Sequence, residues 1–256
     1  MEIIGVFSGK GGVGKTTIAS NLAVVFSKAG KRVCVVDCNV TASHLGLHFN
    51  FHLTPLSITH VLNGRAELVD VAHNFEGVSV VPAPIDPYEA HGVDLSSLKK
   101  LIKKELVNYD FVILDTAPGF GREMLSAAEM CEKAIIVSTP DIAAVTDAVR
   151  GIRILGDMGV EIEGIVLNKV FGKKFELSSG EVEAILEKPV IAEIPFSLKF
   201  LEALSLRIPL VIYSEKCLPS LEIHALASRF VEEKIYPELG PGDKIKIFLE
   251  KKLRNL

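Results

Sequence analysis

The sequence lacks the features that carry a chain into or across a membrane on its own. It starts its first predicted strand at once, without a basic segment followed by an apolar one, and it contains no run of 18 apolar residues. Its four cysteines, Cys34, Cys38, Cys131 and Cys217, include no CxxC pair. We therefore expect a cytoplasmic protein with no disulfide and no zinc site.

An excess of positive charge is also missing. The 256 residues include 28 Lys and Arg against 32 Asp and Glu, and the resulting net charge of -4 argues against a surface that coats nucleic acid. A hydrophobic content of 48% and a charged content of 23% describe a globular protein with ample core. The length suits a single α/β domain, so no second domain is needed.

Short β-branched runs alternate with segments of helix length. Residues 111–114 and 134–137 are apolar on both faces, as are the strands of a parallel sheet that is covered on both sides. We predict a doubly wound α/β fold, with a mostly parallel sheet and helices on both faces. Ligands of such sheets bind at the carboxyl ends of the strands. The predicted strands are 2–8, 32–37, 77–81, 110–115, 133–138, 162–167 and 189–194, and the polar residues at their carboxyl ends are Ser8, Asp37, Asp115, Thr139 and Asn168.

Residues 8–17 read SGKGGVGKTT and contain the pattern GxxxxGKT between a strand pattern and a helix pattern. The glycines let successive backbone N–H groups turn inward around an anion, and the following helix adds the positive end of its dipole. In such phosphate loops the position of Lys15 reaches the β- and γ-phosphates, and the Thr16 hydroxyl binds Mg²⁺. The predicted nucleotide-binding residues here are Gly9, Lys10, Gly11, Gly12, Val13, Gly14, Lys15, Thr16 and Thr17.

Lys10 is an extra lysine, which a nucleotide bound in its own loop does not explain. The string KGGVGKTT resembles the deviant Walker A motif of the MinD/ParA family of P-loop ATPases. In that family the early lysine crosses a dimer interface to the phosphates held by the partner subunit. The resemblance implies that Lys10 acts as arginine fingers do, by placing positive charge where the transferring phosphoryl group is negative. The alternative is a solvated loop lysine.

Carboxylates follow two of the predicted strands, at Asp37 and Asp115. Asp115 resembles the Walker B aspartate, which holds Mg²⁺ through a water, and residues 116–121 then form the second switch loop. The alternative for Asp115 is a helix N-cap. Residues 37–47 look like the first switch of MinD, which makes Asp37, together with Lys10 and Lys15, a candidate catalytic residue.

The resemblance covers about residues 1–230 and is closest to MinD. Residues 165–169 look like the MinD strand whose asparagine reads adenine, and Ile194-Pro195 look like the adjoining adenine loop. This implies that Asn168 and Pro195 contact the base and that the ligands are ATP, ADP and Mg²⁺. The amide of Asn168 also matches the N6 and N7 edge of adenine in its donor and acceptor groups. The alternative is a turn asparagine.

The sequence departs from the MinD pattern at two places. MinD-like proteins usually carry a second aspartate two residues after the first in this switch, and here that candidate catalytic position is Asn39. Since an amide can align water but cannot accept its proton, we predict slow hydrolysis and a persistent ATP-bound dimer. Residues 196–198, after Pro195, read Phe-Ser-Leu where relatives often have acidic residues, so the base contacts of this loop stay open.

Three histidines, His44, His48 and His52, are spaced so that one continuous helix would place them on one face. Such a face can bind a transition metal. Gly46 lies within the segment and a proline follows it at position 55, which argues against a single helix. We therefore expect solvent-facing histidines.

The linker 239–243 separates the predicted ATPase domain, residues 1–238, from a tail at 244–256. On a helical wheel the tail has one apolar side flanked by basic residues, the composition of an interfacial membrane helix. It resembles the C-terminal membrane-targeting helix of MinD. The alternative is a helix packed on its own domain or on a partner. The predicted membrane-contacting residues are Ile245, Phe248, Leu249, Leu253 and Leu256.

The resemblance implies an ATPase that forms a face-to-face homodimer when ATP is bound and associates reversibly with the anionic inner face of the cell membrane. It also implies an unidentified regulatory or cargo partner and a role in spatial regulation, such as division-site placement. The alternatives are a ParA-like DNA-partitioning ATPase, a flagellar-positioning regulator of the same MinD type, and an iron-sulfur carrier. The acidic balance makes nucleic acid an unexpected partner.

Overall fold

The strands of the computed structural model form one sheet, whose order is β3-β4-β2-β5-β1-β6-β7-β8. The structure describes residues 1–51, 54–90, 95–231 and 233–254. The strands are β1 (Glu2–Phe7), β2 (Val33–Asp37), β3 (His73–Phe75), β4 (Val78–Val81), β5 (Phe111–Asp115), β6 (Lys133–Ser138), β7 (Glu161–Val170) and β8 (Val190–Pro195).

The sheet is parallel except at one edge, which confirms the predicted doubly wound α/β fold. Each of the seven predicted runs forms a strand within a few residues of its expected bounds. The edge strand β3 was not predicted, because it has only three residues and pairs antiparallel with β4 through a tight turn. Both turn residues, Glu76 and Gly77, have positive φ angles of 49° and 81°, as the hairpin turn requires.

The connections between the strands are helical. The helices are α1 (Lys15–Lys28), α2 (Leu45–His48), α3 (Ile58–Leu62), α4 (Leu68–Val71), α5 (Pro87–Ala90), α6 (Leu98–Glu105), α7 (Arg122–Met130), α8 (Ile142–Asp157), α9 (Ser179–Leu186), α10 (Lys199–Ser205), α11 (Leu210–Tyr213), α12 (Leu218–Val231) and α13 (Pro241–Arg254), with a 3₁₀ turn at Leu95–Ser97. Among these described helices, none is long and apolar enough to cross a bilayer.

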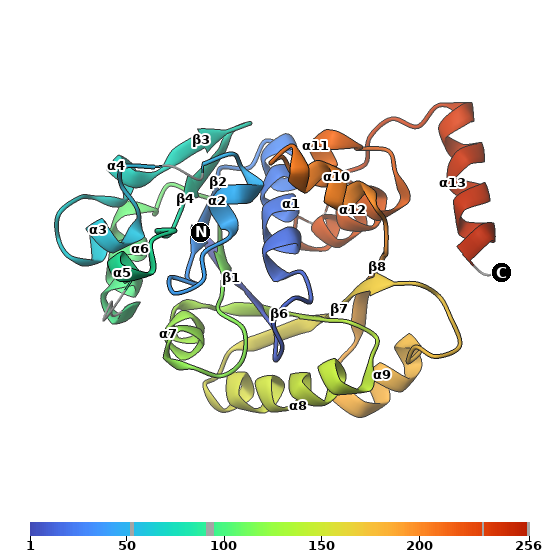
Figure 1. The fold of residues 1–256 in the computed structure, drawn as a ribbon, viewed down its shortest axis with the longest axis horizontal. Coiled ribbons are helices and arrows are strands. Elements are labelled where there is room, and N and C mark those ends of the chain that lie inside the picture. Colours follow the sequence, from blue (N-terminus) through green and yellow to red (C-terminus); the bar gives the residue numbers. More distant parts are fainter. Residues whose placement is uncertain (52–53, 91–94, 232, 255–256) are drawn as a thin grey trace.

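Two hydrophobic layers cover the sheet, one on each face. On one face α1 and α12 pack on the central strands, with Phe26 of α1 stacked on Phe111 of β5 at 4.5 Å between ring centroids. On the other face α6, α7, α8 and α9 supply the core partners of the same strands. Figure 1 shows α8 and α9 below the sheet and α1, α10 and α12 above it. Burial on both faces explains why the central strands are apolar throughout.

The tail helix α13 begins at Pro241, three residues before the start expected from the sequence. A proline suits the first position of a helix because its missing N–H would be unpaired there, and the Asp243 carboxylate accepts a hydrogen bond from Gly240 N at 3.0 Å. Two ion pairs join α13 to the domain, Lys216 with Asp243 at 3.3 Å and Lys251 with Glu222 at 3.8 Å. In Figure 1 the helix stands at the edge of the molecule beyond α12.

Candidate nucleotide-binding site

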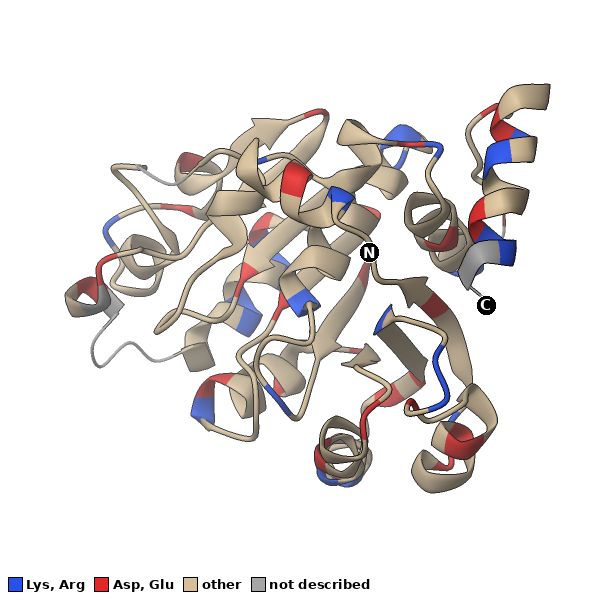
Figure 2. Ribbon diagram, turned by 45° about the vertical axis from the view of Figure 1, so that its right-hand side comes forward, with Lys and Arg blue, Asp and Glu red and all other residues tan. Residues whose placement is uncertain are grey.

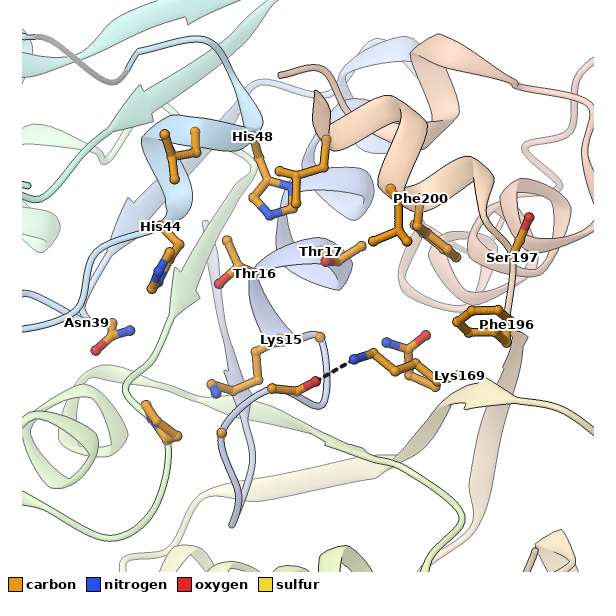
Figure 3. Close-up of a pocket in the computed structure, with 18 of the residues that line it drawn as sticks. Lys15, Thr16, Thr17, Asn39, His44, His48, Lys169, Phe196, Ser197 and Phe200 are labelled. Atoms are coloured by element: carbon orange, nitrogen blue, oxygen red, sulfur yellow. Dashed lines mark hydrogen bonds between the residues drawn. The ribbon is translucent and has the colours of Figure 1, made fainter. Parts of the chain in front are cut away.

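A cavity of about 490 Å³ lies at the carboxyl ends of β7 and β8, beside the loop that follows β1. Residues of this loop line it together with Asn39, His44 and His48 from the segment after β2. Asn168 and Lys169 of β7 and the residues after β8 close the opposite side. Figure 3 shows these side chains around one space. The cavity therefore lies where ligands of doubly wound sheets bind.

The loop after β1 holds Lys15 in a fixed place. Lys15 is 7% exposed, its Nζ donates to Ser8 Oγ at 2.9 Å, and Ser8 Oγ donates to the carbonyl of Lys10 at 2.7 Å. Burial lowers the pKa of Lys15, and the nearby Asp115 carboxylate opposes this shift. Gly14 caps the N-terminus of α1 with a φ of 101°, which a residue with a side chain rarely adopts. The loop thus presents one buried cation at the N-terminus of a helix, which is a binding site for phosphate.

The second lysine of the loop, Lys10, is exposed and is absent from the residues that line the cavity. It lies near the N-terminus of α8, where Asp141 accepts a hydrogen bond from Ala144 N at 3.0 Å. Burial opposes the ionisation of Asp141, but hydrogen bonds from Thr139 and Ala144 and the charge of Lys10 outweigh it and lower the pKa of Asp141. The two lysines therefore face different surroundings, one inside the site and one outside.

Asp115 ends β5 beside the loop and is 1% exposed. Its side chain accepts a hydrogen bond from Thr16, while its Oδ1 is buried and has no hydrogen-bond partner among the described residues. Burial raises the pKa of Asp115 to about 7, the Asp37 carboxylate adds to this, and Thr16 and Lys15 oppose it. An unpaired carboxylate oxygen next to a hydroxyl fits a hard cation such as Mg²⁺, whose ligands are oxygen atoms. These residues are therefore suited to hold the metal.

Asp37, at the end of β2, is fully buried and binds its own chain instead of lining the cavity. Its Oδ1 accepts from Asn39 N at 3.0 Å, and its Oδ2 accepts from Ser43 Oγ at 2.7 Å and from Leu45 N at 3.3 Å. Burial raises the pKa of Asp37 to about 6, and these three hydrogen bonds oppose the shift. The carboxylate holds the segment 39–45 in place at the cavity wall.

Asn168 reaches the loop from β7, and its Nδ2 donates to the carbonyl of Val13 at 2.8 Å. Pro195, which ends β8, and the following Phe196 line the cavity close to it. The Phe196 ring stacks on Phe171 with 4.6 Å between ring centroids. The structure therefore places Asn168 and Pro195, the two residues expected to contact the base, on the lining of one cavity.

Sequence reasoning missed several residues of the site. Lys169 Nζ donates to the carbonyl of Gly12 at 2.7 Å, so it joins β7 to the loop at the cavity wall. Phe200, Leu201 and Leu204 of α10 form an apolar wall of the cavity. The helical spacing of these apolar residues was visible in the sequence, but nothing in it indicated that their side faces a cavity instead of the core.

The three histidines do not share a helix. The helix α2 has only four residues, His44 caps its start with an exposed side chain, and His48 ends it with a side chain that is 8% exposed. His52 lies outside the described residues. The expectation of solvent-facing histidines is therefore wrong for His48, which packs against Ser20 of α1. No group of three metal-binding side chains occurs among the described residues.

Comparisons with known proteins agree with this geometry. The ParA family model, described as NUBPL iron-transfer P-loop NTPase, matches residues 1–230. An uncharacterized ATP-binding protein of Methanocaldococcus jannaschii is 32% identical over 254 residues, which are 99% of this chain and 96% of that protein. The cell division ATPase MinD of Pyrococcus furiosus superposes with a TM-score of 0.86 at 29% identity, over 90% of this chain and 98% of that chain.

The septum site-determining protein MinD of Pyrococcus horikoshii OT3, solved in complex with Mg-ADP, has a TM-score of 0.85 at 29% identity, over 90% of this chain and 95% of that chain. The chain therefore belongs to the ParA/MinD family of P-loop NTPases.

Proposed function

We propose that this protein is a MinD-like ATPase that binds ATP with Mg²⁺, pairs face to face with a second copy, and associates reversibly with an anionic membrane surface. Hydrolysis to ADP then releases both contacts. Its cellular role is spatial regulation, such as division-site placement, through a regulatory or cargo partner. Its location is the cytoplasm and the inner face of the cell membrane.

The observation that carries this proposal is the separation of the two loop lysines. Lys15 is buried and points into the cavity, which suits a ligand of the nucleotide held by its own subunit. Lys10 is exposed outside the cavity, so its charge is available to phosphates held by another copy. A cation supplied across an interface stabilises the charge of phosphoryl transfer, as an arginine finger does.

The other residues have roles that follow from their positions. The backbone N–H groups of residues 9–17 surround the phosphates, and Asn168 and Pro195 contact the adenine. Thr16 and Asp115 would hold Mg²⁺, Asp115 through a water, and the bound metal would neutralise negative charge on the phosphates. Asp37 contributes to catalysis by holding the segment that faces the γ-phosphate.

We further propose that hydrolysis is slow, because Asn39 stands where a carboxylate would take the proton of the attacking water. The Asn39 Nδ2 donates to the carbonyl of Ala42 at 2.7 Å, so its amide is partly engaged inside the loop. The variant Asn39→Asp should raise kcat by about 10²-fold, the lower range for general-base catalysis. Rapid turnover of the natural protein that does not change in this variant would contradict the proposal.

The membrane contact is assigned to α13. Ile245, Phe248 and Leu249 are 62%, 66% and 51% exposed, which is unusual for a row of large apolar residues on one helix. Lysines flank this row, and each is worth about 1 kcal/mol near an anionic leaflet. Leu256 lies outside the described residues, as does the side chain of Leu253. One short helix binds weakly, whereas two helices joined in a dimer gain avidity of about 10² to 10⁴.

Two other readings have less support. Along the described part of the chain, basic and acidic residues are interspersed in the view of Figure 2, which does not favour the DNA-partitioning alternative.

For iron transfer, Cys34, Cys38 and Cys217 are buried, and burial raises the pKa of the Cys34 thiol to about 12. Thiols that stay protonated are poor iron ligands. A flagellar-positioning role differs from division-site placement only in the partner.

Co-sedimentation with liposomes that contain anionic lipid tests this proposal. The full chain, a chain that ends at Gly240, and the variant Phe248→Glu are compared under ADP with Mg²⁺ and under ATP with Mg²⁺. We expect ATP to bring only the full natural chain into the pellet, because dimerisation joins two apolar helices and a glutamate at Phe248 removes one anchor from each. Size-exclusion chromatography with light scattering checks the dimer in the same samples.

The outcomes separate the alternatives. If the full chain forms a dimer with ATP but no version pellets, α13 binds a partner or the domain instead of a lipid surface. If the dimer binds a DNA duplex instead of liposomes, the partitioning alternative is correct. If ATP neither binds nor produces a dimer, the whole proposal fails.

A further inference from the structure

His44 occupies a place in the site that its family resemblance does not explain. It lies just before α2, with an exposed side chain, and it lines the same cavity as Lys15, Thr16 and Asn39. In the view of Figure 3 its imidazole points into the cavity, between Asn39 and Thr16 and above the loop that holds Lys15. The ring makes no hydrogen bond with any other residue in the described ranges. The ring interacts electrostatically with the buried Asp37 carboxylate, but no hydrogen bond within the described residues occupies its nitrogens, so they can bind a ligand in this space.

The residues on both sides of His44 are fixed to one buried carboxylate. Ser43 Oγ donates to Asp37 Oδ2 at 2.7 Å and to the carbonyl of Ala83 at 3.2 Å, and Leu45 N donates to Asp37 Oδ2 at 3.3 Å. The backbone of His44 is consequently held from both sides. A side chain on such a support has the small positional freedom that a reacting group needs.

Among the described residues that line the cavity, none carries a carboxylate that could accept a proton. Asn39 donates its Nδ2 to the carbonyl of Ala42, and its amide oxygen can accept a hydrogen bond but not a proton. His48 is 8% exposed, and its Nδ1 lies 3.4 Å from Ser20 Oγ, so it is part of the wall. Asp37 has both oxygens engaged within the loop. A neutral imidazole, by contrast, offers one ring nitrogen as an acceptor.

We propose that the His44 imidazole accepts the hydrogen bond, and then the proton, of the water that attacks the γ-phosphate, and so replaces the carboxylate that Asn39 lacks. This inference rests on the proposed ATPase function. The water oxygen forms a bond to the γ-phosphorus, and the bond from that phosphorus to the β,γ-bridging oxygen breaks. Its electron pair stays on ADP, and the proton on the ring nitrogen then passes to solvent.

With His44 as the proton acceptor, the site has every group that hydrolysis needs, although turnover is slow. Asn39 orients the water through its amide oxygen, and His44 takes the proton from a position further along the same segment. If a carboxylate were restored at position 39, the two acceptors would be alternatives. The effect of removing His44 should then depend on the residue at position 39, which a merely structural role would not produce.

Single-turnover hydrolysis of ATP with Mg²⁺ tests this dependence. The natural chain is compared with His44→Ala, His44→Gln, Asn39→Asp and the double variant Asn39→Asp/His44→Ala. The dissociation constant of ATP is measured separately for each by equilibrium binding. We expect His44→Ala and His44→Gln to lower the rate by about 10²-fold with unchanged ATP affinity, because neither side chain can take a proton. The double variant should recover at least the natural rate.

Several results would overturn the inference. These are a natural rate in His44→Ala or His44→Gln, a loss of ATP affinity in proportion to the loss of rate, and a double variant that stays as slow as His44→Ala. In each case the natural chain still binds and hydrolyses ATP, so the proposed function stands while the role of His44 is rejected. If the natural chain binds no ATP, the proposed function fails and the inference falls with it.

Discussion

Lys10 and Lys15 belong to one glycine-rich loop but have opposite surroundings. The Lys15 ammonium lies within the protein and is held by Ser8 at 2.9 Å, whereas Lys10 is exposed beside Asp141. A buried cation at a phosphate site contributes to binding by its own subunit. An exposed cation contributes only when something approaches it from outside.

Substitution of the two lysines should therefore affect different properties, ATP binding for Lys15 and kcat for Lys10. We expect Lys15→Ala to abolish ATP binding, and Lys10→Ala to keep the ATP affinity of the monomer within a few-fold while it lowers kcat by about 10³-fold or more. Fluorescence titration with an ATP analogue and a phosphate-release assay separate the two effects. Equal losses of affinity in both variants would contradict the assignment of Lys10 to the partner's nucleotide.

For single residues, the sequence predicted local chemical roles better than it predicted burial and hydrogen-bond partners. The spacing GxxxxGKT indicated where Lys15 and Thr16 would lie, because the chemistry of a phosphate loop is local. The sequence analysis placed His48 at the surface, but its side chain is buried on α1. Nor did the sequence indicate that Asp37 would bind Ser43 and Leu45, since hydrogen bonds to a buried carboxylate depend on a loop conformation.

Elements meet through a few buried polar contacts, and Asn21 makes one of them. It is 1% exposed on α1, its Nδ2 donates to the carbonyl of Thr17 at 2.7 Å, and its Oδ1 accepts from Val211 N at 2.9 Å. We expect Asn21→Leu to lower the free energy of unfolding by about 1 to 3 kcal/mol, because it leaves the Val211 N–H buried without a partner. Urea denaturation measures this change.

A matched control for this prediction is Thr146→Ala, which removes an exposed hydrogen bond inside α8. Its free energy of unfolding should stay within about 0.5 kcal/mol of the natural value. If Asn21→Leu is as stable as the control, the hydrogen bond between α1 and α11 contributes nothing.

The contact between α2 and α1 should make stability depend on pH through His48. Burial lowers the pKa of His48 to about 4, and the nearby His44 adds to this shift. The unfolded chain, with an ordinary pKa of about 6.5, binds the proton first, so the contribution is complete above about pH 6.5 and is lost as the pH falls toward 4. Between pH 7 and pH 5 the natural chain should lose about 2 kcal/mol more than His48→Gln.

Urea denaturation without nucleotide at both pH values checks this difference. The subtraction between the two chains removes the effects of other buried titratable groups, among which Asp37 and Asp115 have raised pKa values that act in the opposite direction. Parallel pH dependence in the natural chain and His48→Gln would contradict the burial argument.

The strands of the parallel sheet were predictable because a strand that is buried on both faces has a continuous run of apolar residues in the sequence. The edge strand β3 (His73–Phe75) has a half-exposed pattern and no such run. The short helices α2, α4 and α11 have four residues each, which is barely one turn, so no periodicity marks them. Their positions depend on the packing of the segments that they connect.

Segments from both halves of the chain line the cavity, namely the loop after β1, helices α1, α2 and α10, and strands β7 and β8. Nucleotide should therefore stabilise all of these segments at once. At about 100 times the dissociation constant, ADP with Mg²⁺ should add about 2.7 kcal/mol, or about 5 to 10 °C in Tm for a chain of this size. Differential scanning fluorimetry measures the shift, and Lys15→Ala should show none. A shift in that variant equal to the natural one would place the nucleotide elsewhere.

The central position of β1 has a consequence for synthesis on the ribosome. Its two neighbours in the sheet are β5 and β6. Glu2 therefore pairs only after Phe111 has been synthesised, and Ile4 pairs with β6 only after Lys133 has been synthesised. Pairings over such sequence distances are slow to form. At about 5 to 20 residues per second, the phosphate loop is synthesised about 9 to 36 s before Pro195 is added. Until β7 and β8 have been made, the nascent chain carries the phosphate loop without the other walls of its cavity, so we expect ATP to bind only after Pro195 has been added.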